Sequence, residues 1–225
     1  MPDNIPPPAL APLLEPGHTA LLVIDVQNDY CHPQGALGRN GADLDFVAPA
    51  VENIVRLIET ARQVGVTVIF LRNWHEHWTE SPGWRARAPR QSRAGQARSW
   101  GAEFFTVAPT QDEPVLNKQR YDAFIGTPLD STLRALERRT VVLTGFGTNV
   151  CVESTARHAV FLDYRIVLVS DATDTADGPS AHQASLDTIA RHFGPVATTS
   201  DILTAWSRRH HEQTFGAVDR SERAS

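Results

Sequence analysis

Three side chains with reactive groups follow apolar segments of the sequence. Asp25 ends the run TALLVID, Lys118 ends EPVLNK, and Cys151 closes the segment TVVLTGFGTNVC. A thiolate is a strong nucleophile, a carboxylate can accept the thiol proton and pass it to a leaving amine, and a nearby ammonium lowers the thiol pKa. Together these groups would suit hydrolysis of an amide through a covalent cysteine intermediate.

Each of the three residues also has a purely structural interpretation. Asp25 could cap a turn, Lys118 could lie at a solvated strand end, and Cys151 could be a small core residue, as most free cysteines are. Their shared position favours chemistry, because an open α/β sheet binds ligands outside the carboxyl ends of its strands. His75 and His158 leave a cysteine–histidine pair as a weaker alternative.

Apolar strands that alternate with amphipathic helices predict the elements that would position these groups. Strands are expected at 19–25, 66–72, 113–118, 140–145 and 166–173, with a last one within 195–206 that leads into a C-terminal helix. Helices are expected at 43–65, 127–139, 150–165 and 180–194, with Gly65 as a C-cap. This alternation predicts one α/β domain whose mostly parallel sheet is covered by helices on both sides.

The sequence divides into a Pro-rich arm at 1–16, a domain at 17–206 and a polar tail at 207–225. The connection at 73–112 is far longer than usual, and such a segment typically forms a lid or a binding loop. We see no second core and no internal repeat.

Composition excludes several functional classes. The formal net charge of the 225 residues is only −5, and the Arg-rich stretch 83–98 lacks aromatic interleaving, so nucleic acid is not expected as a partner. The sequence contains no apolar run long enough to cross a membrane and no signal-peptide pattern. Two cysteines, Cys31 and Cys151, do not make a disulfide scaffold. A soluble cytoplasmic protein is therefore expected.

Three segments resemble the signatures of the isochorismatase-like cysteine hydrolases: LLVIDVQNDY, LNKQRYDAFIGTPLDSTL and LTGFGTNVCVESTARHA. The resemblance covers roughly residues 17 to 204 and implies a Rossmann-like, doubly wound sheet. It also implies that Asp25, Lys118 and Cys151 form a catalytic triad.

The same resemblance implies an oxyanion hole made by the backbone N–H groups of Thr148 and Cys151. It places a cis peptide bond between Gly147 and Thr148. A cis bond that does not involve proline costs about 3–4 kcal/mol, so it is expected only where the surrounding structure holds it.

Members of this family differ in substrate, and two differences are visible here. True isochorismatases lack the cysteine, so Cys151 argues against that activity. Nicotinamidases carry a metal-binding Asp-x-His pair after the second strand, where this chain reads RNWHEHW with Asn73 in place of the Asp. His75 and His77 are a weak ligand pair on a loop, so we expect no metal and no other cofactor.

The segments RYDAFIGTPLDSTL and TNVCVESTARHAVFLDY are most similar to the ureide branch, which includes ureidoacrylate, biuret and triuret hydrolases. The predicted function is cleavage of the C–N bond of a small linear ureide or carboxamide by water, with release of ammonia or an amine. By position, the pocket should be lined by Tyr30, Asn73, Trp74, Tyr121 and Phe124. Aromatic walls with one amide suit a small, planar, hydrogen-bonding substrate.

Several alternatives stay open at this point. A nicotinamidase-type carboxamidase and a non-catalytic scaffold or binding protein are the two rival functions. Arg120 or an arginine within 85–98 could bind a substrate carboxylate, whereas biuret or triuret would need none. The family resemblance also implies a homotetramer or a larger homo-oligomer.

Overall fold

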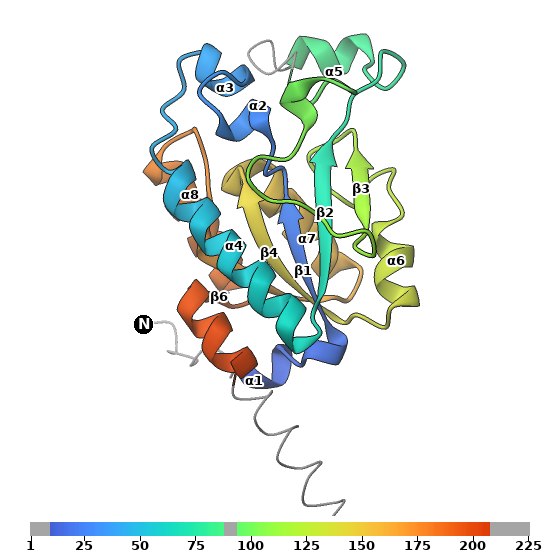
Figure 1. Cartoon of the computed structure of the whole chain (residues 1–225), viewed down its shortest axis with the longest axis vertical. Coiled ribbons are helices and arrows are strands. Elements are labelled where there is room, and N and C mark those ends of the chain that lie inside the picture. The colour runs from blue at the N-terminus through green and yellow to red at the C-terminus, as the bar shows by residue number, and fades with distance from the viewer. Residues whose placement is uncertain (1–9, 88–93, 208–225) are drawn as a thin grey trace, which may run out of the picture.

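The computed structural model describes residues 10–87 and 94–207, which form a single α/β domain (Figure 1). Its sheet has the strand order β3-β2-β1-β4-β5-β6, and all neighbouring strands are parallel. The strands are β1 (Thr19–Ile24), β2 (Thr67–Asn73), β3 (Val115–Lys118), β4 (Thr140–Phe146), β5 (Arg165–Asp174) and β6 (Val196–Ala197). The chain builds outward from β1 in both directions, so the predicted doubly wound sheet is confirmed.

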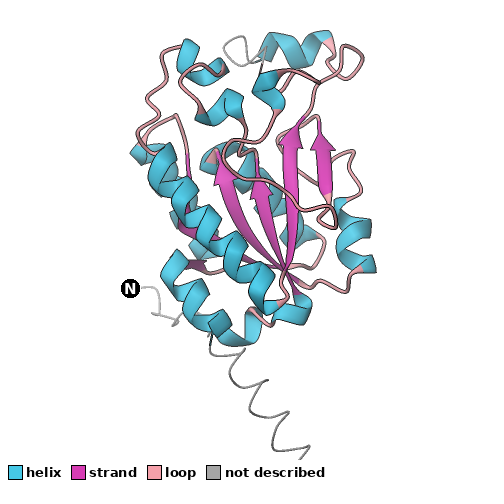
Figure 2. Ribbon diagram, in the orientation of Figure 1, coloured by secondary structure: helices cyan, strands magenta, loops and turns pink. Residues whose placement is uncertain are grey.

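Helices cover both faces of this sheet (Figure 2). Helix α4 (Val47–Val64) and the helix at 199–207 pack on one face. The other face is covered by α6 (Leu129–Ala135), α7 (Glu153–Phe161) and α8 (Pro179–His192). Each helix therefore buries one apolar side against the sheet and leaves the other to solvent.

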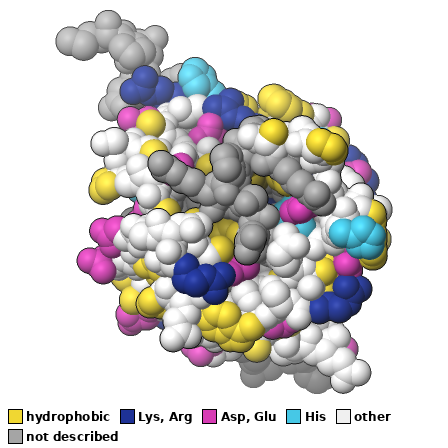
Figure 3. Space-filling view, turned by 90° about the horizontal axis from the view of Figure 1, so that it is seen from above, with side chains coloured by type: hydrophobic (Ala, Val, Ile, Leu, Met, Phe, Trp, Pro, Cys, Tyr) yellow, Lys and Arg dark blue, Asp and Glu magenta, His cyan; other side chains and the backbone are white. Residues whose placement is uncertain are grey.

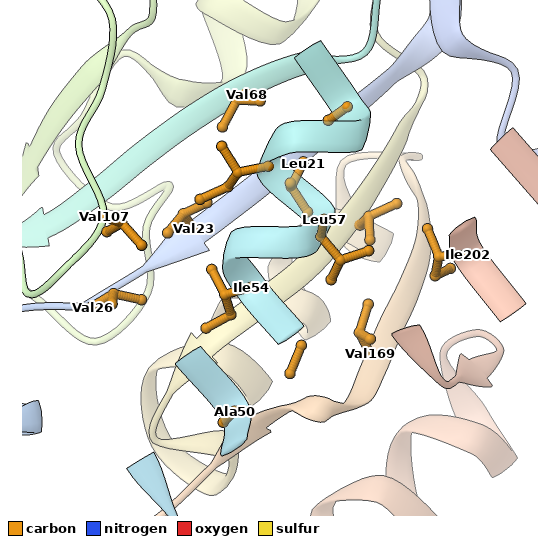
Figure 4. Packing of buried hydrophobic residues seen from close by; sticks show 14 of the residues in the cluster. Leu21, Val23, Val26, Ala50, Ile54, Leu57, Val68, Val107, Val169 and Ile202 are labelled. Carbon is orange, nitrogen blue, oxygen red and sulfur yellow. The ribbon is translucent and has the colours of Figure 1, made fainter. Parts of the chain in front are cut away.

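Strand β1 lies at the centre of the core, and all six of its residues are buried. Because successive side chains point to opposite faces, Leu21 and Val23 pack under α4 while Leu22 and Ile24 pack toward α6 and α7. Figure 4 shows Leu21 and Val23 against Ile54 and Leu57 of α4. This burial on both faces explains why β1 is a continuous apolar run rather than an alternating one.

Short elements lie at the two ends of the sheet (Figure 1). Helices α2 (Asn28–Cys31), α3 (Ala36–Arg39) and α5 (Pro82–Arg87) and the 3-10 turn Trp100–Ala102 lie beyond the carboxyl ends of the strands. Helix α1 (Leu10–Leu13) and the 3-10 turn Pro16–His18 lie at the opposite end. Leu14 is buried in the core, so the end of the Pro-rich arm packs against the domain. No helix within the described ranges is long and apolar enough to cross a bilayer.

The observed elements differ from the expected ones mainly at their ends. Helix α4 begins at Val47 rather than residue 43, because the Asp43 carboxylate accepts a hydrogen bond from the Asp45 N–H and so forms a turn. It ends as predicted, with Gly65 as its C-cap at φ 80°. The helix expected at 150–165 starts instead with a wide π-helical turn, Thr148–Val152, and α7 stops at Phe161.

Candidate active site

The structure brings Asp25, Lys118 and Cys151 together at one edge of the sheet. Asp25 directly follows β1, Lys118 ends β3, and Cys151 lies in the turn after β4. The direction of winding reverses between β1 and β4, which is where an open α/β sheet forms its binding crevice. All three side chains are buried.

The Lys118 ammonium lies between the other two groups. Its Nζ is 2.7 Å from Asp25 Oδ2 and 3.5 Å from Cys151 Sγ. It also donates hydrogen bonds to Asn73 Oδ1 at 3.0 Å and to the Arg120 carbonyl at 3.3 Å. A fully buried ammonium is unfavourable unless it is paired, and these contacts provide the pairing.

Asn73 orients the Asp25 carboxylate. The Asn73 backbone N–H donates to Asp25 Oδ1 and its side-chain Nδ2 donates to Asp25 Oδ2, both at 3.1 Å. The same Nδ2 donates to the Tyr30 hydroxyl at 2.9 Å, and the Gln27 side chain accepts from the Asn73 N–H at 2.8 Å. Asp25 itself has a left-handed backbone, φ 55°, which turns its side chain off the end of β1. Asn73 was expected only as a pocket residue, and it also holds Asp25 and Lys118 in place.

The protonation states at this site follow from burial and charge together. Burial raises the pKa of the Cys151 thiol; Lys118 opposes the increase, while Asp25 adds to it through its charge and a hydrogen bond. The expectation of a lowered thiol pKa is therefore wrong, because desolvation outweighs the ammonium. Burial disfavours the Lys118 ammonium, yet Asp25 and Cys151 raise the Lys118 pKa overall. The resting site thus holds a thiol beside a lysine–aspartate ion pair.

A tight junction after β4 positions Cys151. Gly145 has φ 110°, and a Cβ atom there would lie 1.9 Å from the Ile24 carbonyl oxygen, so only glycine lets β4 approach β1 this closely. The cis peptide bond joins Phe146 to Gly147, and the predicted position between Gly147 and Thr148 is wrong by one residue. Strand β4 ends at Phe146 and the helical turn begins at Thr148, so the cis bond falls where the strand meets the turn.

The turn that carries Cys151 is tied to α8 and to the segment after β5. Thr148 Oγ1 lies 2.8 Å from His182 Nδ1, and Asn149 Nδ2 donates to Asp177 Oδ2 at 2.8 Å. The backbone N–H groups of Thr148 and Cys151 both belong to this turn. Their contribution to an oxyanion hole stays a prediction.

A small cavity opens above this cluster, with a volume of about 80 Å³. Asp25, Cys151, Tyr30, Asn73 and Tyr121 line it. Sites for drug-sized ligands typically measure about 300–1,000 Å³, so this one suits a substrate of a few heavy atoms. Burial, together with the nearby Asp25, raises the pKa of Tyr30 far above its usual value, so its hydroxyl remains a hydrogen-bond donor.

Two of the predicted pocket residues do not line the cavity. Side chains alternate along the end of β2, so Trp74 points away from the side of Asn73, and the Arg72 guanidinium stacks 3.9 Å from the centre of its ring. Phe124 is buried in the core, with its ring 5.9 Å from that of Tyr164. Both residues serve packing instead.

Other cavity residues were not predicted to line the pocket. His75, Glu80 and Trp84 come from the connection between β2 and β3, and they line the cavity. For Glu80 and Trp84 the signal in the sequence was the unusual length of this connection, whereas His75 was also considered as a possible partner of the cysteine. His158 pairs with Asp122 and does not line the cavity, so the cysteine–histidine alternative for that residue is not supported. Within the described ranges, no group of three or more His, Cys, Asp or Glu side chains is arranged to hold a metal.

Comparison with known proteins gives consistent results. The model of the isochorismatase domain matches residues 19–201. Ureidoacrylate amidohydrolase RutB from Cronobacter turicensis is 36% identical over 208 residues, covering 85% of this chain and 90% of that protein. The crystal structure of a cysteine hydrolase from Pseudomonas syringae pv. phaseolicola superposes with a TM-score of 0.80 at 30% identity, covering 88% of this chain and 96% of that one.

A second solved structure represents another activity on the same fold. Nicotinamidase PncA from Bacillus subtilis superposes with a TM-score of 0.70 at 25% identity, covering 80% of this chain and 99% of that one. The family match spans most of the chain and includes the segments that carry Asp25, Lys118 and Cys151. The chain therefore belongs to the isochorismatase family.

Proposed function

We propose that this protein is a cysteine-dependent amidohydrolase that cleaves the C–N bond of a small linear ureide or carboxamide. The observation that carries the proposal is the buried Lys118 ammonium, which contacts both Asp25 and Cys151, two residues that line a small cavity. A purely structural lysine would gain little from such a position, because burial of a charge is costly. The similarity to ureidoacrylate amidohydrolases supports a ureide as substrate.

Acylation begins when the Asp25 carboxylate takes the proton of the Cys151 thiol. The sulfur then attacks the carbonyl carbon, and the backbone N–H groups of Thr148 and Cys151 stabilise the negative charge that develops on oxygen. As the C–N bond breaks, Asp25 returns the proton to the leaving nitrogen, so ammonia or an amine departs. Lys118 stabilises the charge as it moves from the carboxylate to the sulfur.

Deacylation repeats the same proton transfers with water. Asp25 takes a proton from a water molecule that attacks the acyl- or carbamoyl-cysteine carbonyl. The C–S bond breaks, and the proton returns to the Cys151 sulfur, which restores the thiol and releases the acid product. No cofactor takes part in these steps.

The two rival functions are less well supported. In a nicotinamidase-type site a carboxylate would stand where Asn73 lies, whereas here the Asn73 amide bonds to Asp25, Tyr30 and Lys118. A non-catalytic scaffold gives no reason to keep the ion pair and the thiol at a cavity. We therefore favour the ureide amidohydrolase.

Ammonia release from a panel of substrates tests the proposal. The panel contains ureidoacrylate, biuret, triuret, an N-carbamoyl amino acid and nicotinamide, assayed with the wild-type protein and the Cys151→Ser variant. We expect release from at least one ureide, little from nicotinamide, and none in the variant. Preference for nicotinamide would favour the carboxamidase, and silence with every compound would favour the scaffold.

We also propose that the enzyme works in the cytoplasm as a homotetramer or larger homo-oligomer, as the family resemblance implies. Light scattering after size exclusion measures the mass directly. A monomer of 24.8 kDa in solution would contradict the proposed oligomeric state.

A further inference from the structure

Gln27 carries a side-chain amide that is completely buried and is hydrogen bonded at both of its ends. Its Oε1 accepts from the Asn73 N–H at 2.8 Å. Its Nε2 donates to the carbonyl oxygens of Asn73 at 3.0 Å and of Ala102 at 2.8 Å. Gln27 stands at the N-cap of α2, yet its side chain makes no capping bond to that helix. The amide therefore serves the end of β2 and the connection that follows it.

These contacts continue the strand pairing beyond the point where β1 ends. Strands β1 and β2 pair as far as Ile24 and Leu71, and the Asp25 N–H then donates to the Leu71 carbonyl at 2.9 Å. Because the backbone groups of a strand face its two neighbours in alternation, the N–H and C=O of Asn73 lie on the same side as those of Leu71. The Gln27 amide offers them one acceptor and one donor, as a peptide unit of β1 would. Gln27 thus extends the β1–β2 pairing by one residue.

Asn73 transmits this placement to the groups that react. Its side-chain amide contacts Asp25 Oδ2 at 3.1 Å, Lys118 Nζ at 3.0 Å and the Tyr30 hydroxyl at 2.9 Å. Its backbone N–H is shared between Gln27 Oε1 at 2.8 Å and Asp25 Oδ1 at 3.1 Å. A reorientation of the Asn73 backbone would therefore disturb both charged groups of the triad, and a displacement of about 1 Å in an active site can cost about 10²-fold in rate.

Gln27 itself lies away from the space that a substrate would occupy. It does not belong to the described lining of the cavity. Hydrophobic, acidic and basic side chains are interspersed on the described surface over this end of the molecule (Figure 3), whereas the Gln27 side chain lies inside. A change at Gln27 should therefore alter the rate of the reaction more than the binding of the substrate.

We infer that Gln27 is a positioning residue of the proposed hydrolysis. Its amide holds the Asn73 backbone by two hydrogen bonds, and Asn73 in turn holds the Asp25 carboxylate and the Lys118 ammonium beside Cys151. This inference rests on the proposed function and adds to it a residue that acts through another. Without the Gln27 amide, the Asn73 carbonyl would lose the hydrogen bond that it accepts in a buried place, and the end of β2 would be free to shift.

The next residue, Asn28, provides a matched control. Its Nδ2 donates to the Trp100 carbonyl at 2.8 Å, so it fastens the same 3-10 turn, Trp100–Ala102, that Gln27 fastens through Ala102. Both side chains are buried. Gln27 also bonds to Asn73, whereas no hydrogen bond joins Asn28 to Asn73. Comparison of the two therefore separates the fastening of the turn from the placement of Asn73.

The test compares Gln27→Met with Asn28→Leu, since each replaces an amide by an apolar side chain of similar size. Both variants should unfold at a lower urea concentration than the wild type, because each leaves a buried carbonyl without its donor. With the best ureide of the panel, Gln27→Met should lower kcat by about 10–10²-fold and keep KM within about threefold. Asn28→Leu should keep both kcat and KM within about threefold of the wild type.

A second variant, Gln27→Asn, decides the question if Gln27→Met does not fold. Its amide is one methylene too short to bond to both backbone groups of Asn73, so kcat should still decrease by at least about threefold with KM unchanged. A wild-type kcat in a folded Gln27 variant, an equal loss in Asn28→Leu, or a loss confined to KM would overturn the inference and leave the proposed function intact. No Cys151-dependent hydrolysis of any ureide by the wild-type protein would overturn the proposed function and the inference with it.

Discussion

Cys31 and Cys151 are both buried free thiols within apolar clusters, yet the polar groups around them differ. Their exposed fractions are 3% and 6%, and burial raises the pKa of both. Cys31 lies in the apolar cluster beneath α4, whereas Cys151 lines the cavity and contacts Lys118. Neither burial nor the direction of the pKa change separates a nucleophile from a core residue. A nucleophile is distinguished instead by neighbouring groups that can accept the thiol proton or stabilise the charge on the sulfur.

The same contrast holds for the aspartates of the two regions. Asp29, two residues before Cys31, accepts hydrogen bonds from the backbone N–H groups of Ala36 and Gly95, at 3.0 and 2.8 Å. Those bonds fasten α3 and the connection between β2 and β3. Asp25 also accepts one backbone N–H, that of Asn73, but in addition it contacts the Lys118 ammonium and the Asn73 side chain. One carboxylate satisfies backbone donors, and the other is placed to exchange a proton with a thiol.

Serine substitutions at the two cysteines should produce the largest difference. Cys151→Ser should lower kcat by at least about 10³-fold, because a hydroxyl is a far weaker nucleophile at this position. Cys31→Ser should keep kcat within about twofold and instead lower the free energy of unfolding by about 1–3 kcal/mol, since it buries a hydroxyl among apolar side chains. Ureide hydrolysis and urea denaturation measure the two effects. Comparable activity in both variants would contradict the distinction between Cys151 as the nucleophile and Cys31 as a core residue.

Asparagine substitutions extend the comparison to the aspartates. Asp25→Asn should lower kcat by about 10²–10⁴-fold, the range that a general acid–base group contributes. Asp29→Asn should leave Asp25 as the proton acceptor and should lower stability, because the NH₂ that replaces one carboxylate oxygen cannot accept the backbone N–H bonded there. The pH-rate profile should keep its shape in Asp29→Asn and change in Asp25→Asn. A larger kcat loss from Asp29→Asn would contradict the assignment of Asp25.

How much of this site was predictable depends on what each residue's neighbours in sequence reveal. Asp25, Lys118 and Cys151 follow apolar segments, and parallel strands bring their carboxyl ends to one edge, so their proximity could be predicted. The raised pKa of Cys151 could not be predicted, because it depends on how deeply the turn after β4 is enclosed. The boundaries of the helices were approximate for a similar reason, since local turns such as that at Asp43 compete with helix formation.

The connection between β2 and β3 was the least predictable region. It has no repeating apolar pattern, so nothing indicated that Glu80 and Trp84 would reach the cavity, and His75 was considered only as a weaker partner for the cysteine. Trp74 and Phe124 were placed in the pocket by position, but their orientations depend on the alternation after β2 and on packing against Tyr164. Side-chain direction beyond a strand end is a property of the folded structure.

The ion pair itself can be tested by a double-variant cycle on stability. Lys118→Met should lower the free energy of unfolding by about 3–5 kcal/mol, because it leaves the buried Asp25 carboxylate without its partner. The double variant Lys118→Met/Asp25→Asn should be more stable than Lys118→Met alone, since it removes the unpaired charge as well. Urea denaturation of the four proteins gives the coupling energy. Additive losses would mean that the two groups do not stabilise each other.

Alkylation rates should show the smallest but most direct difference between the cysteines. Because burial raises both thiol pKa values, only a small fraction of either is thiolate at pH 7, and this fraction increases about tenfold for each pH unit below the pKa. Iodoacetamide labelling, followed by peptide mass spectrometry between pH 6.5 and 9, should therefore accelerate with pH at both sites. Cys151 should react at least about tenfold faster than Cys31, because it lines the cavity and has Lys118 beside it. A rate at Cys151 that is already constant at neutral pH would instead mean a preformed thiolate, and the proton would then have left before substrate binding rather than moving to Asp25 during attack.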